Sequence, residues 1–492
     1  MEYIAGKKSV KVGSIVRILD RLVLVEALLM TVPLVVCLMY GESDWKGFVI
    51  AIAAAATTGG AAELSTRRCR TSVRSREGII LTAVVWIVFG LFGMIPLMLS
   101  SAPLGFTDAM FEVISGFTTT GASVITDVEA QSHGILFWRA FTQWIGGLGI
   151  IFFMLAVLPE LNKASGISMF NAEATGITHG KLHPRIRQTA LSLWGVYSTL
   201  TIVSIVLLWI GPMNLFDSIC QTFAAIATGG FTTHNSGIAF WQSDYVMIVL
   251  LVVMYFAGLN FMAIYAGWKH GMKELFRNDV TRAFTRLVII VYLLFMLAAF
   301  LRGEEFTVGN FLIDPLFHIL SAVTSTGFGV AGAESWGYFT LFLTIILMIC
   351  GACAGSTSGG IKVDRLAVLA RNFKNEIRKT VFPKRTYVVS LNGSALNSNL
   401  VSRVSAFVSL YLLIVAIATA VVTLWGYTMI DSLFMVLSTV GCNGLGYGAT
   451  GVAGSFASLP FAIKWIMVAL MLIGRLELFT ILVLFLPSFW RR

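Results

Sequence analysis

One stretch decides the fold of this chain, and it reads Asp108-Ala-Met-Phe-Glu-Val-Ile-Ser-Gly-Phe-Thr-Thr-Thr-Gly121. An acidic residue opens a short apolar run, and the run closes on a cluster of threonine and glycine. The same thirteen-position spacing recurs in three further copies, at 217–230, 314–327 and 431–444. Four copies at one spacing indicate an internal repeat of roughly 100 residues.

Each copy predicts a short helix with a defined end. We expect the aspartate to be the N-cap, because its carboxylate accepts hydrogen bonds from the free N–H groups of the first turn. Ten residues at about 1.5 Å each give a helix of roughly 15 Å, half the hydrocarbon thickness of a bilayer. The helix therefore enters a membrane without crossing it. The closing clusters favour extended or left-handed backbone, and they lie at 118–121, 227–230, 324–327 and 441–444.

Composition and charge place the chain in a membrane. Of its 492 residues 57% are hydrophobic and 12% are charged, which is typical of a polytopic membrane protein. The net charge of +10 does not mark a nucleic-acid surface, because 30 of the 35 lysines and arginines fall in six segments between or beyond apolar spans. All six segments lie on one side if the spans come in pairs, which makes that side cytoplasmic and places both termini there. We expect no nucleic-acid partner.

The apolar spans divide into two that precede the repeat, at 22–40 and 48–62, and four pairs that flank the half-helices. The pairs are expected at 79–99 and 135–158, 190–210 and 245–268, 287–301 and 338 onward, and 404–425 and 461–486. We predict an all-α polytopic membrane protein with four helix–pore loop–helix repeats around a pseudo-four-fold pore and two extra N-terminal helices. The predicted units are 1–77, 78–189, 190–281, 282–401 and 402–492.

The closing clusters are the candidate binding site, because four irregular segments around one axis make a ring of carbonyls. A monovalent cation sheds its water only where other oxygens replace it, and uncharged carbonyls still allow its release. Glycine is needed where a Cβ would crowd that path. The candidate filter residues are Thr119, Thr120, Gly121, Thr228, Gly229, Gly230, Ser325, Thr326, Gly327, Cys442, Asn443 and Gly444. The alternative is four helix-terminating turns without a pore.

The third unit contains a break. Its second apolar run, 338–350, has thirteen residues, too few to span, and Gly351-Ala-Cys-Ala-Gly355-Ser-Thr-Ser-Gly359-Gly360 follows. We expect the helix to end inside the membrane at an irregular loop. The alternative is a kink or a close helix crossing through Gly351 and Gly355.

Arg475 stands in the last apolar run, far from either end of the predicted span. A cation at such depth faces water or a partner, and on the conduction path it would repel other cations. The alternative is a buried pair with an acid from another helix. Glu477 is two positions away and would not face Arg475 on a straight helix.

The four-fold pattern with one glycine in each filter resembles the Trk/Ktr/HKT superfamily of potassium transporters, most closely bacterial Trk uptake subunits of the TrkH/TrkG type. The resemblance is carried by Thr-Thr-Thr-Gly121, Ala-Thr-Gly-Gly230, Ser-Thr-Gly327 and Asn-Gly444. It implies uptake of K⁺, and of Rb⁺, across the bacterial inner membrane. Sodium-preferring members carry serine where this chain has Gly121. The resemblance also implies a gate made of Gly351, Gly355, Ser356, Thr357, Ser358, Gly359 and Gly360 together with Arg475.

Family partners are implied in the same way. The resemblance implies a homodimer on a cytosolic nucleotide-binding regulatory subunit, with the basic loop from Lys362 to Arg403 as docking surface. We expect the nucleotide on that partner and no cofactor on this chain, because the longest polar connection is too short for a nucleotide-binding domain. Two alternatives stay open: a potassium symporter coupled to H⁺ or Na⁺, and a polytopic membrane enzyme, which would need convergent acidic, histidine or serine side chains in the membrane.

Overall fold

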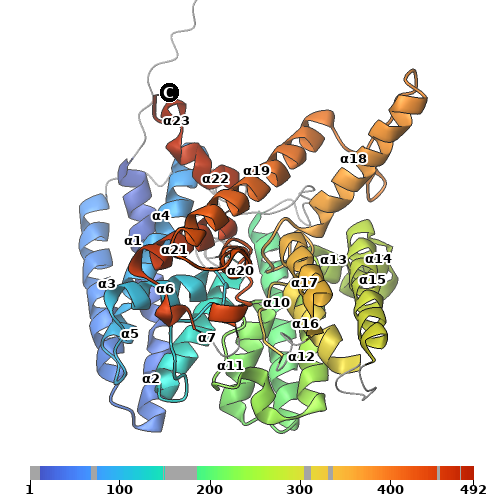
Figure 1. Ribbon diagram of the computed structural model, residues 1–492. Helices are drawn as coiled ribbons and strands as arrows, with labels where there is room; N and C mark the ends of the chain where they lie inside the picture. Colours follow the sequence, from blue (N-terminus) through green and yellow to red (C-terminus); the bar gives the residue numbers. More distant parts are fainter. Residues whose placement is uncertain are drawn as a thin grey trace, which may run out of the picture.

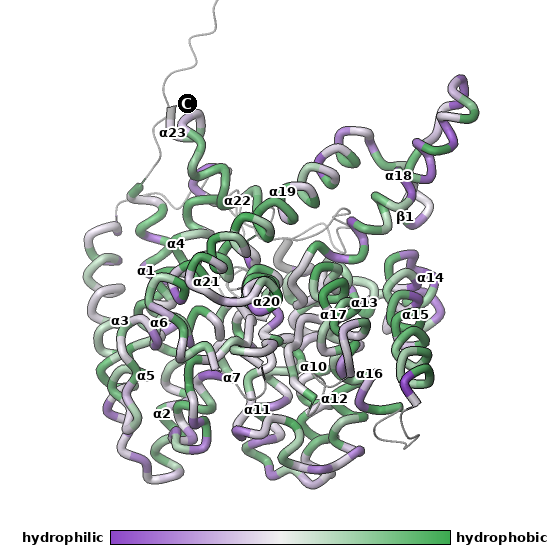
Figure 2. Tube along the Cα trace, viewed as in Figure 1, coloured by the Kyte–Doolittle hydropathy of each residue, from purple (hydrophilic) through white to green (hydrophobic). Residues whose placement is uncertain are grey.

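The computed structural model describes residues 12–67, 75–147, 149, 186–303, 312–330, 336–451, 455–476 and 478–491. Helices dominate these residues, and they form one bundle (Figure 1). Six of the described helices are long and apolar enough to cross a membrane. The number of spans rises to eight when each of two bent helix pairs is counted as one span. Green, apolar residues fill most of the bundle, and purple, hydrophilic residues gather toward its ends and along α18 (Figure 2).

The two N-terminal spans stand at one edge of the bundle (Figure 1). α1 (Val12–Leu29) and α2 (Thr31–Tyr40) run as one apolar stretch, and α3 (Trp45–Thr66) packs back against α1. Gly41 ends α2 in a left-handed conformation, with its N–H bonded to the last-turn carbonyl of Leu38. Both spans are present, as predicted.

Four units follow, each with a long helix, a half-helix and a shorter second helix. The long helices are α4 with α5 (Ser75–Gly93 and Ile95–Met98), α10 (Ile186–Ile210), α15 (Asp279–Arg302) and α19 (Ser398–Thr423). The half-helices are α6 (Phe106–Phe117), α11 (Leu215–Ile226), α16 (Asp314–Val323) and α20 (Met429–Val440). The second helices are α7 (His133–Gly147), α12 (Asp244–Ala257), α17 (Tyr338–Cys350) and α21 (Phe461–Arg475). The predicted repeat architecture is confirmed.

The predicted N-caps were wrong. The aspartate is the third residue of α6, α11 and α20 and the first residue of α16, and the cap positions precede it. In α11 the cap is Asn214, whose side chain accepts a hydrogen bond from the N–H of Asp217 and donates one to its carboxylate at 2.9 Å. Thr428 caps α20 in the same way through its hydroxyl. The aspartates still stabilise these helices, because the first turn is the positive end of the helix dipole.

Two second helices that were predicted to be continuous are broken. α12 ends at Ala257, and α13 (Phe261–His270) leaves at 96° to it; α21 ends at Arg475, and α22 with η7 (Leu478–Leu482 and Val483–Phe485) leaves at 113°. Hydropathy hid both breaks because the residues on either side remain apolar. Asn260 shows why the first occurs, since its side chain accepts from the N–H of Ala263 and starts a new helix there. The predicted extension of α7 at 148–158 lies outside the described residues, apart from Gly149.

The connections on one side of the bundle are polar. α14 (Met272–Arg277) precedes α15, and α18 (Val363–Val381) projects from the bundle on the same side as α23 (Pro487–Arg491) (Figure 1). A two-residue antiparallel pair, β1 (Ser390–Leu391) with β2 (Ser394–Ala395), connects α18 to α19. Other connections hold short 3₁₀ turns, η2 (Gly237–Trp241), η5 (Gly448–Thr450) and η6 (Phe456–Ser458).

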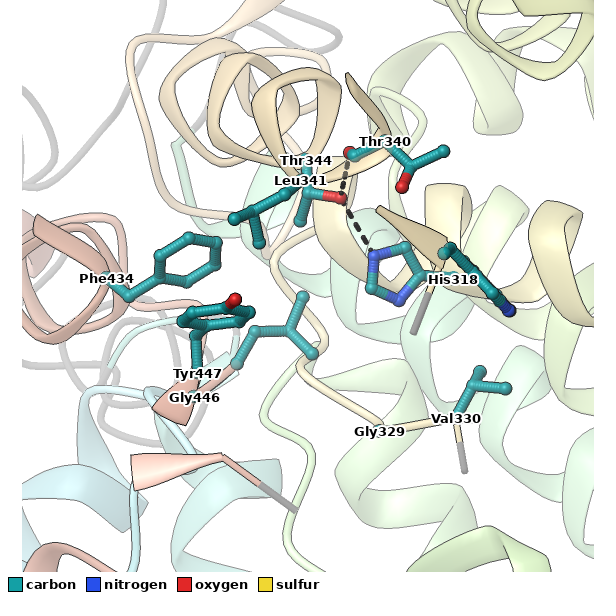
Figure 3. Close-up of a pocket in the computed structure, with 11 residues that line it drawn as sticks. His318, Gly329, Val330, Thr340, Leu341, Thr344, Phe434, Gly446 and Tyr447 are labelled. Carbon is teal, nitrogen blue, oxygen red and sulfur yellow. Dashed lines mark hydrogen bonds between the residues drawn. The ribbon is translucent and has the colours of Figure 1, made fainter. Parts of the chain in front are cut away.

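The third and fourth units enclose a cavity. It has an empty volume of about 480 Å³, part of which opens to solvent, and it lies between α16, α17, α20 and the segments that follow the third and fourth half-helices (Figure 3).

Candidate functional site

All four half-helices end in the same way. After the last turn comes a residue in the left-handed region, and the next residue donates its N–H to a carbonyl five positions back, as in a Schellman motif. The left-handed residues are Thr119 (φ 55°), Thr228 (54°), Ser325 (55°) and Cys442 (47°). The N–H bonds join Thr120 to Ser115, Gly229 to Ala224, Thr326 to Ser321 and Asn443 to Ser438, at 2.8–2.9 Å. A non-glycine residue in this conformation is uncommon, and here it recurs in every copy.

The filter glycines follow at once, and they close a ring. All four have positive φ, between 74° and 81°. A Cβ added at Gly121 would overlap the carbonyl oxygen of Gly229 in the second unit. The same relation carries on around the molecule, from Gly230 to Thr326, from Gly327 to Asn443 and from Gly444 back to Thr120. The four segments therefore meet about one axis, and only glycine satisfies both the backbone angle and the close approach.

Side chains beside the glycines mostly brace the ring. The hydroxyl groups of Thr120 and Thr326 pair with those of Thr118 and Thr324 at 2.8 and 2.7 Å. Thr228 donates to the carbonyl of Ala227 at 2.7 Å, Ser325 donates to that of Thr324 at 2.6 Å, and Asn443 donates to that of Ala322 at 2.6 Å. These hydrogen bonds hold the ends of the half-helices in place, and the main-chain carbonyls are the oxygens that recur in all four units of the ring.

Gln143 is a bracing residue that the sequence reasoning missed. From α7 its Nε2 donates to the ring carbonyl of Gly229 at 2.6 Å, and its Oε1 accepts from the N–H of Phe231 at 3.2 Å. The side chain is fully buried. An isolated amide in an apolar run was the available signal, because a polar group at that depth needs a partner.

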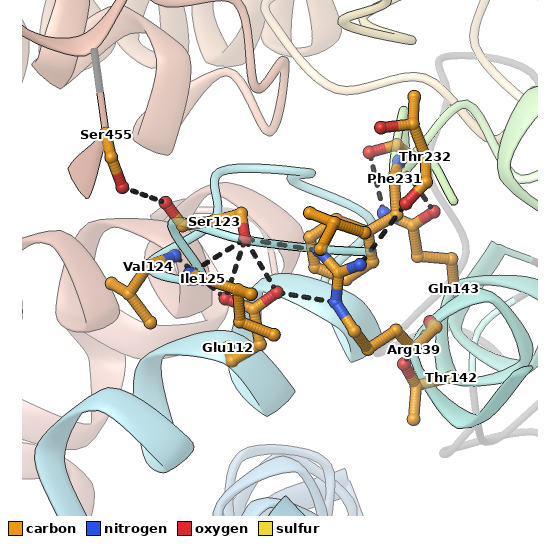
Figure 4. A network of polar contacts seen from close by, with 12 residues as sticks. Glu112, Ser123, Val124, Ile125, Arg139, Thr142, Gln143, Phe231, Thr232 and Ser455 are labelled. Carbon is orange, nitrogen blue, oxygen red and sulfur yellow. Dashed lines mark hydrogen bonds and ion pairs between the residues drawn. The ribbon is translucent and has the colours of Figure 1, made fainter. Parts of the chain in front are cut away.

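A buried ion pair was also missed. Glu112 on α6 and Arg139 on α7 meet at 2.8 Å, with side chains that are 0% and 3% exposed (Figure 4). Glu112 also accepts from the hydroxyl of Ser123 at 2.9 Å and from the N–H of Val124 at 2.9 Å. Its carboxylate is therefore supplied with donors on several sides, as a buried charge requires.

Arg139 extends this network to the second unit. Its Nη1 donates to the carbonyl of Thr232 at 3.3 Å, and its guanidinium lies over the ring of Phe231, 4.2 Å from the centroid. Its Nη2 donates to Ser123 at 3.1 Å. One arginine thus ties the segment that leaves the first filter to the segment that leaves the second (Figure 4).

The loops that follow the first and second filter segments also connect the first two units. Asn235 of the second unit donates from Nδ2 to Asp127 of the first at 2.9 Å and accepts from the N–H of Val128 at 2.7 Å. The hydrogen bond from Asn235 lowers the pKa of Asp127. Asp108, at the start of the first half-helix, pairs with Lys464 of the fourth unit at 2.6 Å.

Residues 351–362 form an irregular loop beneath the ring, so the alternative of a kinked or closely crossing helix was wrong. Glycines 351, 355 and 360 have φ of 65°, 78° and 75°. The N–H of Gly359 donates to the hydroxyl of Ser325 at 2.7 Å, and the hydroxyl of Thr357 donates to the carbonyl of Ile226 at 3.1 Å. A Cβ at Gly359 would overlap the carbonyl of Gly441. The loop thus touches the ends of the second, third and fourth half-helices.

The break in the second unit holds this loop. The N–H of Cys353 donates to the carbonyl of Gly258 at 3.0 Å, and the N–H of Phe261 donates to that of Gly355 at 3.1 Å. Asn260 donates to the carbonyl of Ala354 at 2.6 Å. The break between α12 and α13 and the loop 351–362 would each leave main-chain groups without hydrogen bonds at membrane depth. Here these groups form hydrogen bonds with one another. Inside the loop, Ser356 pairs with Ser358 at 2.9 Å.

Arg475 joins the loop to the first unit. It is the last residue of α21, so the continuous span predicted around it was wrong. Its Nη1 donates to the carbonyl of Thr357 at 2.8 Å, and its Nη2 donates to the carbonyls of Gly147, at 2.8 Å, and Gly146. These carbonyls end α7, where the negative end of the helix dipole favours a cation. Glu477 lies outside the described residues.

Together these features define a multi-pass membrane protein with four pore-loop units around one axis and an irregular loop beneath the ring. Comparison with known proteins gives its family. The sequence profile of TrkH, described as a cation transport protein, matches residues 45–492. The chain belongs to this family of cation transport proteins.

Individual relatives agree over nearly their whole length. The Trk system potassium uptake protein TrkH of Halomonas elongata is 32% identical over 97% of this chain and 99% of its own. The Trk system potassium uptake protein TrkG of Escherichia coli is 33% identical over 96% of this chain and 97% of its own. The crystal structure of the potassium transporter TrkH from Vibrio parahaemolyticus matches with a TM-score of 0.88 and 31% identity, over 98% of this chain and all of that one.

Proposed function

We propose that this chain takes up potassium ions across the inner membrane of a bacterium through the ring formed by its four filter segments. The observation that carries the proposal is the closed relation of each filter glycine to a carbonyl of the next unit. Relatives of similar length named for potassium uptake support the choice of ion.

The ring suits a large monovalent cation. Its repeated oxygens are uncharged carbonyls, at Thr120, Gly229, Thr326 and Asn443, so they replace hydration water without holding the ion too tightly to release. Each half-helix ends at the ring, and the negative end of its dipole adds to the attraction. The transported ion is the cargo, and we assign no cofactor to this chain.

The loop 351–362 and Arg475 are proposed as the barrier below the ring. The loop occupies the space under three half-helix ends, and Arg475 anchors it through Thr357 to the end of α7. A guanidinium in this position repels an arriving cation. Opening then requires the arginine to leave these carbonyls or the loop to move aside.

Regulation is assigned to other chains. We infer that both termini and the basic loops, including α18, lie in the cytoplasm, and the distribution of lysine and arginine supports this orientation. A homodimer on a nucleotide-binding cytosolic subunit docked at this basic side fits that placement. The nucleotide would bind the regulatory subunit.

Rubidium flux tests the transport proposal directly. The full-length protein in liposomes is expected to take up radioactive Rb⁺ down its gradient, with external K⁺ competing far better than Na⁺. Protein-free liposomes are the control. Absence of uptake, or equal competition by the two ions, would refute potassium conduction. Uptake that appears only with a proton or sodium gradient would show coupled symport instead.

Arg475→Ala is expected to raise basal Rb⁺ uptake at low external potassium by on the order of tenfold, because removing one anchor worth about 1.4 kcal/mol shifts a closed–open equilibrium by that factor. Arg475→Lys keeps the charge but lacks the fork that reaches the carbonyls of both Thr357 and Gly147. Lysine should therefore rescue the barrier only in part. Equal uptake by wild type and Arg475→Ala, at matched amounts of inserted protein, would remove Arg475 from the barrier.

A further inference from the structure

The position of Glu112 has a counterpart in every unit, nine residues before each filter glycine. The four residues are Glu112, Gln221, His318 and Met435. Glu112 pairs with Arg139, and Gln221 bonds to Thr233. His318 of the third unit instead lines the cavity between the third and fourth units (Figure 3). The repeat position that holds the acid of an ion pair in the first unit thus holds an imidazole beside empty space in the third unit.

The hydrogen bonds around His318 define its tautomer. When the hydroxyl of Thr344 donates its single hydrogen to the carbonyl of Thr340 at 2.9 Å, it accepts from His318 Nε2, 3.0 Å away. We assign this tautomer, in which the ring hydrogen is on Nε2 and Nδ1 carries a lone pair. His318 is 8% exposed, and Nδ1 has no hydrogen-bond partner among the described residues. A donor that enters the cavity would satisfy this buried acceptor.

The cavity wall limits what that donor can be. The residues that line it are His318, Gly329, Val330, Trp336, Thr340, Leu341, Thr344, Phe434, Leu445, Gly446 and Tyr447. None of these described residues is an aspartate, glutamate, lysine or arginine, so this part of the wall offers no countercharge to an ion. The rings of Phe434 and Tyr447 stack at 5.0 Å and present an aromatic surface. The empty volume of about 480 Å³ includes open solvent, so the enclosed part of the cavity limits the occupant to a small molecule.

We propose that this cavity is a binding site for a small neutral molecule with an aromatic or short aliphatic body and one hydrogen-bond donor, of the phenol or alcohol type, which donates to His318 Nδ1. Binding of such a molecule goes beyond the proposed transport. The cavity adjoins the filter, because Gly329 follows Gly327 by two residues and Leu445 follows Gly444 directly. An occupant wedged between the two units is therefore expected to alter Rb⁺ uptake.

Binding is measured on the full chain in lipid nanodiscs by fluorine NMR, with 4-fluorophenol as the probe and 4-fluorotoluene as its partner without a donor. Empty nanodiscs correct for partition into lipid. Wild type should bind the phenol about fivefold more tightly than the toluene, as one net hydrogen bond provides. His318→Leu should erase this preference while both probes still bind.

Two further variants make the test decisive. Leu341→Trp fills the cavity and should abolish binding of both probes, and it decides the matter if His318→Leu does not fold. Gln221→Leu changes the same register position in the second unit and should leave binding unchanged. Signals no different from empty nanodiscs, or a phenol preference that survives His318→Leu, would overturn the site. Because the readout is binding, its failure is separate from any failure of transport.

Discussion

Gly121→Ser is expected to lower Rb⁺ uptake by on the order of a hundredfold and to remove most of the discrimination between K⁺ and Na⁺, because a factor of 100 corresponds to about 2.7 kcal/mol, the scale of overpacking at one close contact. The added Cβ would overlap the carbonyl of Gly229, and φ at this position is 81°. The carbonyl must move outward or rotate. One oxygen of the ring is then displaced, and the fit to a dehydrated potassium ion is lost.

Gly105→Ser is the matched control for this change. Gly105 precedes the same half-helix, has φ of −63°, and has nothing within 4 Å of an added Cβ. Serine is also a favourable residue at an N-cap. Uptake by Gly105→Ser should equal that of wild type. If Gly121→Ser also kept wild-type uptake and selectivity, the ring at Gly121 would not be the path.

Arg139→Met is expected to lower the free energy of unfolding by about 3–5 kcal/mol, because it leaves the carboxylate of Glu112 buried without its partner. The pair is 2.8 Å apart and almost wholly buried, and Arg139 also holds the carbonyl of Thr232. Unfolding by graded denaturant in one detergent measures the change. Potassium selectivity should fall as well, since the segments leaving the first two filters lose their tie.

A double-mutant cycle separates the pair from its parts. Glu112→Gln with Arg139→Met should cost much less than the sum of the single changes, because no unpaired charge remains buried. Arg21→Met is the control, since Arg21 and Glu63 pair at 3.3 Å with side chains more than a fifth exposed. That change should cost below about 1 kcal/mol. Additive losses at Glu112 and Arg139 would show that the two residues act independently.

Local features of the chain were predicted well. The half-helices, the glycine at each filter and the loop after Cys350 are visible in sequence because each depends on a few neighbouring residues. The N-cap prediction failed even though it was local. Asp217 and Asp431 both favour a helix start, but Asn214 and Thr428, three residues earlier, provide the side-chain oxygen that caps the helix.

Contacts between distant residues were not predicted. The break after Ala257 is stabilised by loop residues almost a hundred positions later, where Asn260 meets Ala354. Arg475 reaches the carbonyl of Gly147 across 328 positions. An apolar run looks the same whether it is straight or broken, because main-chain groups at a break are satisfied by whichever segment happens to lie opposite.

The sequence by itself determined the number and order of the units, the short length of their half-helices and the need for glycine in each filter, because periodicity and backbone preference act within one segment. Only the tertiary structure decided that Gly121 abuts Gly229, that Arg139 ties two filters together, and that His318 faces a cavity while Glu112 faces an arginine. Residues at one repeat position share a backbone environment, but the neighbouring unit provides their partners, and the four neighbours differ in sequence.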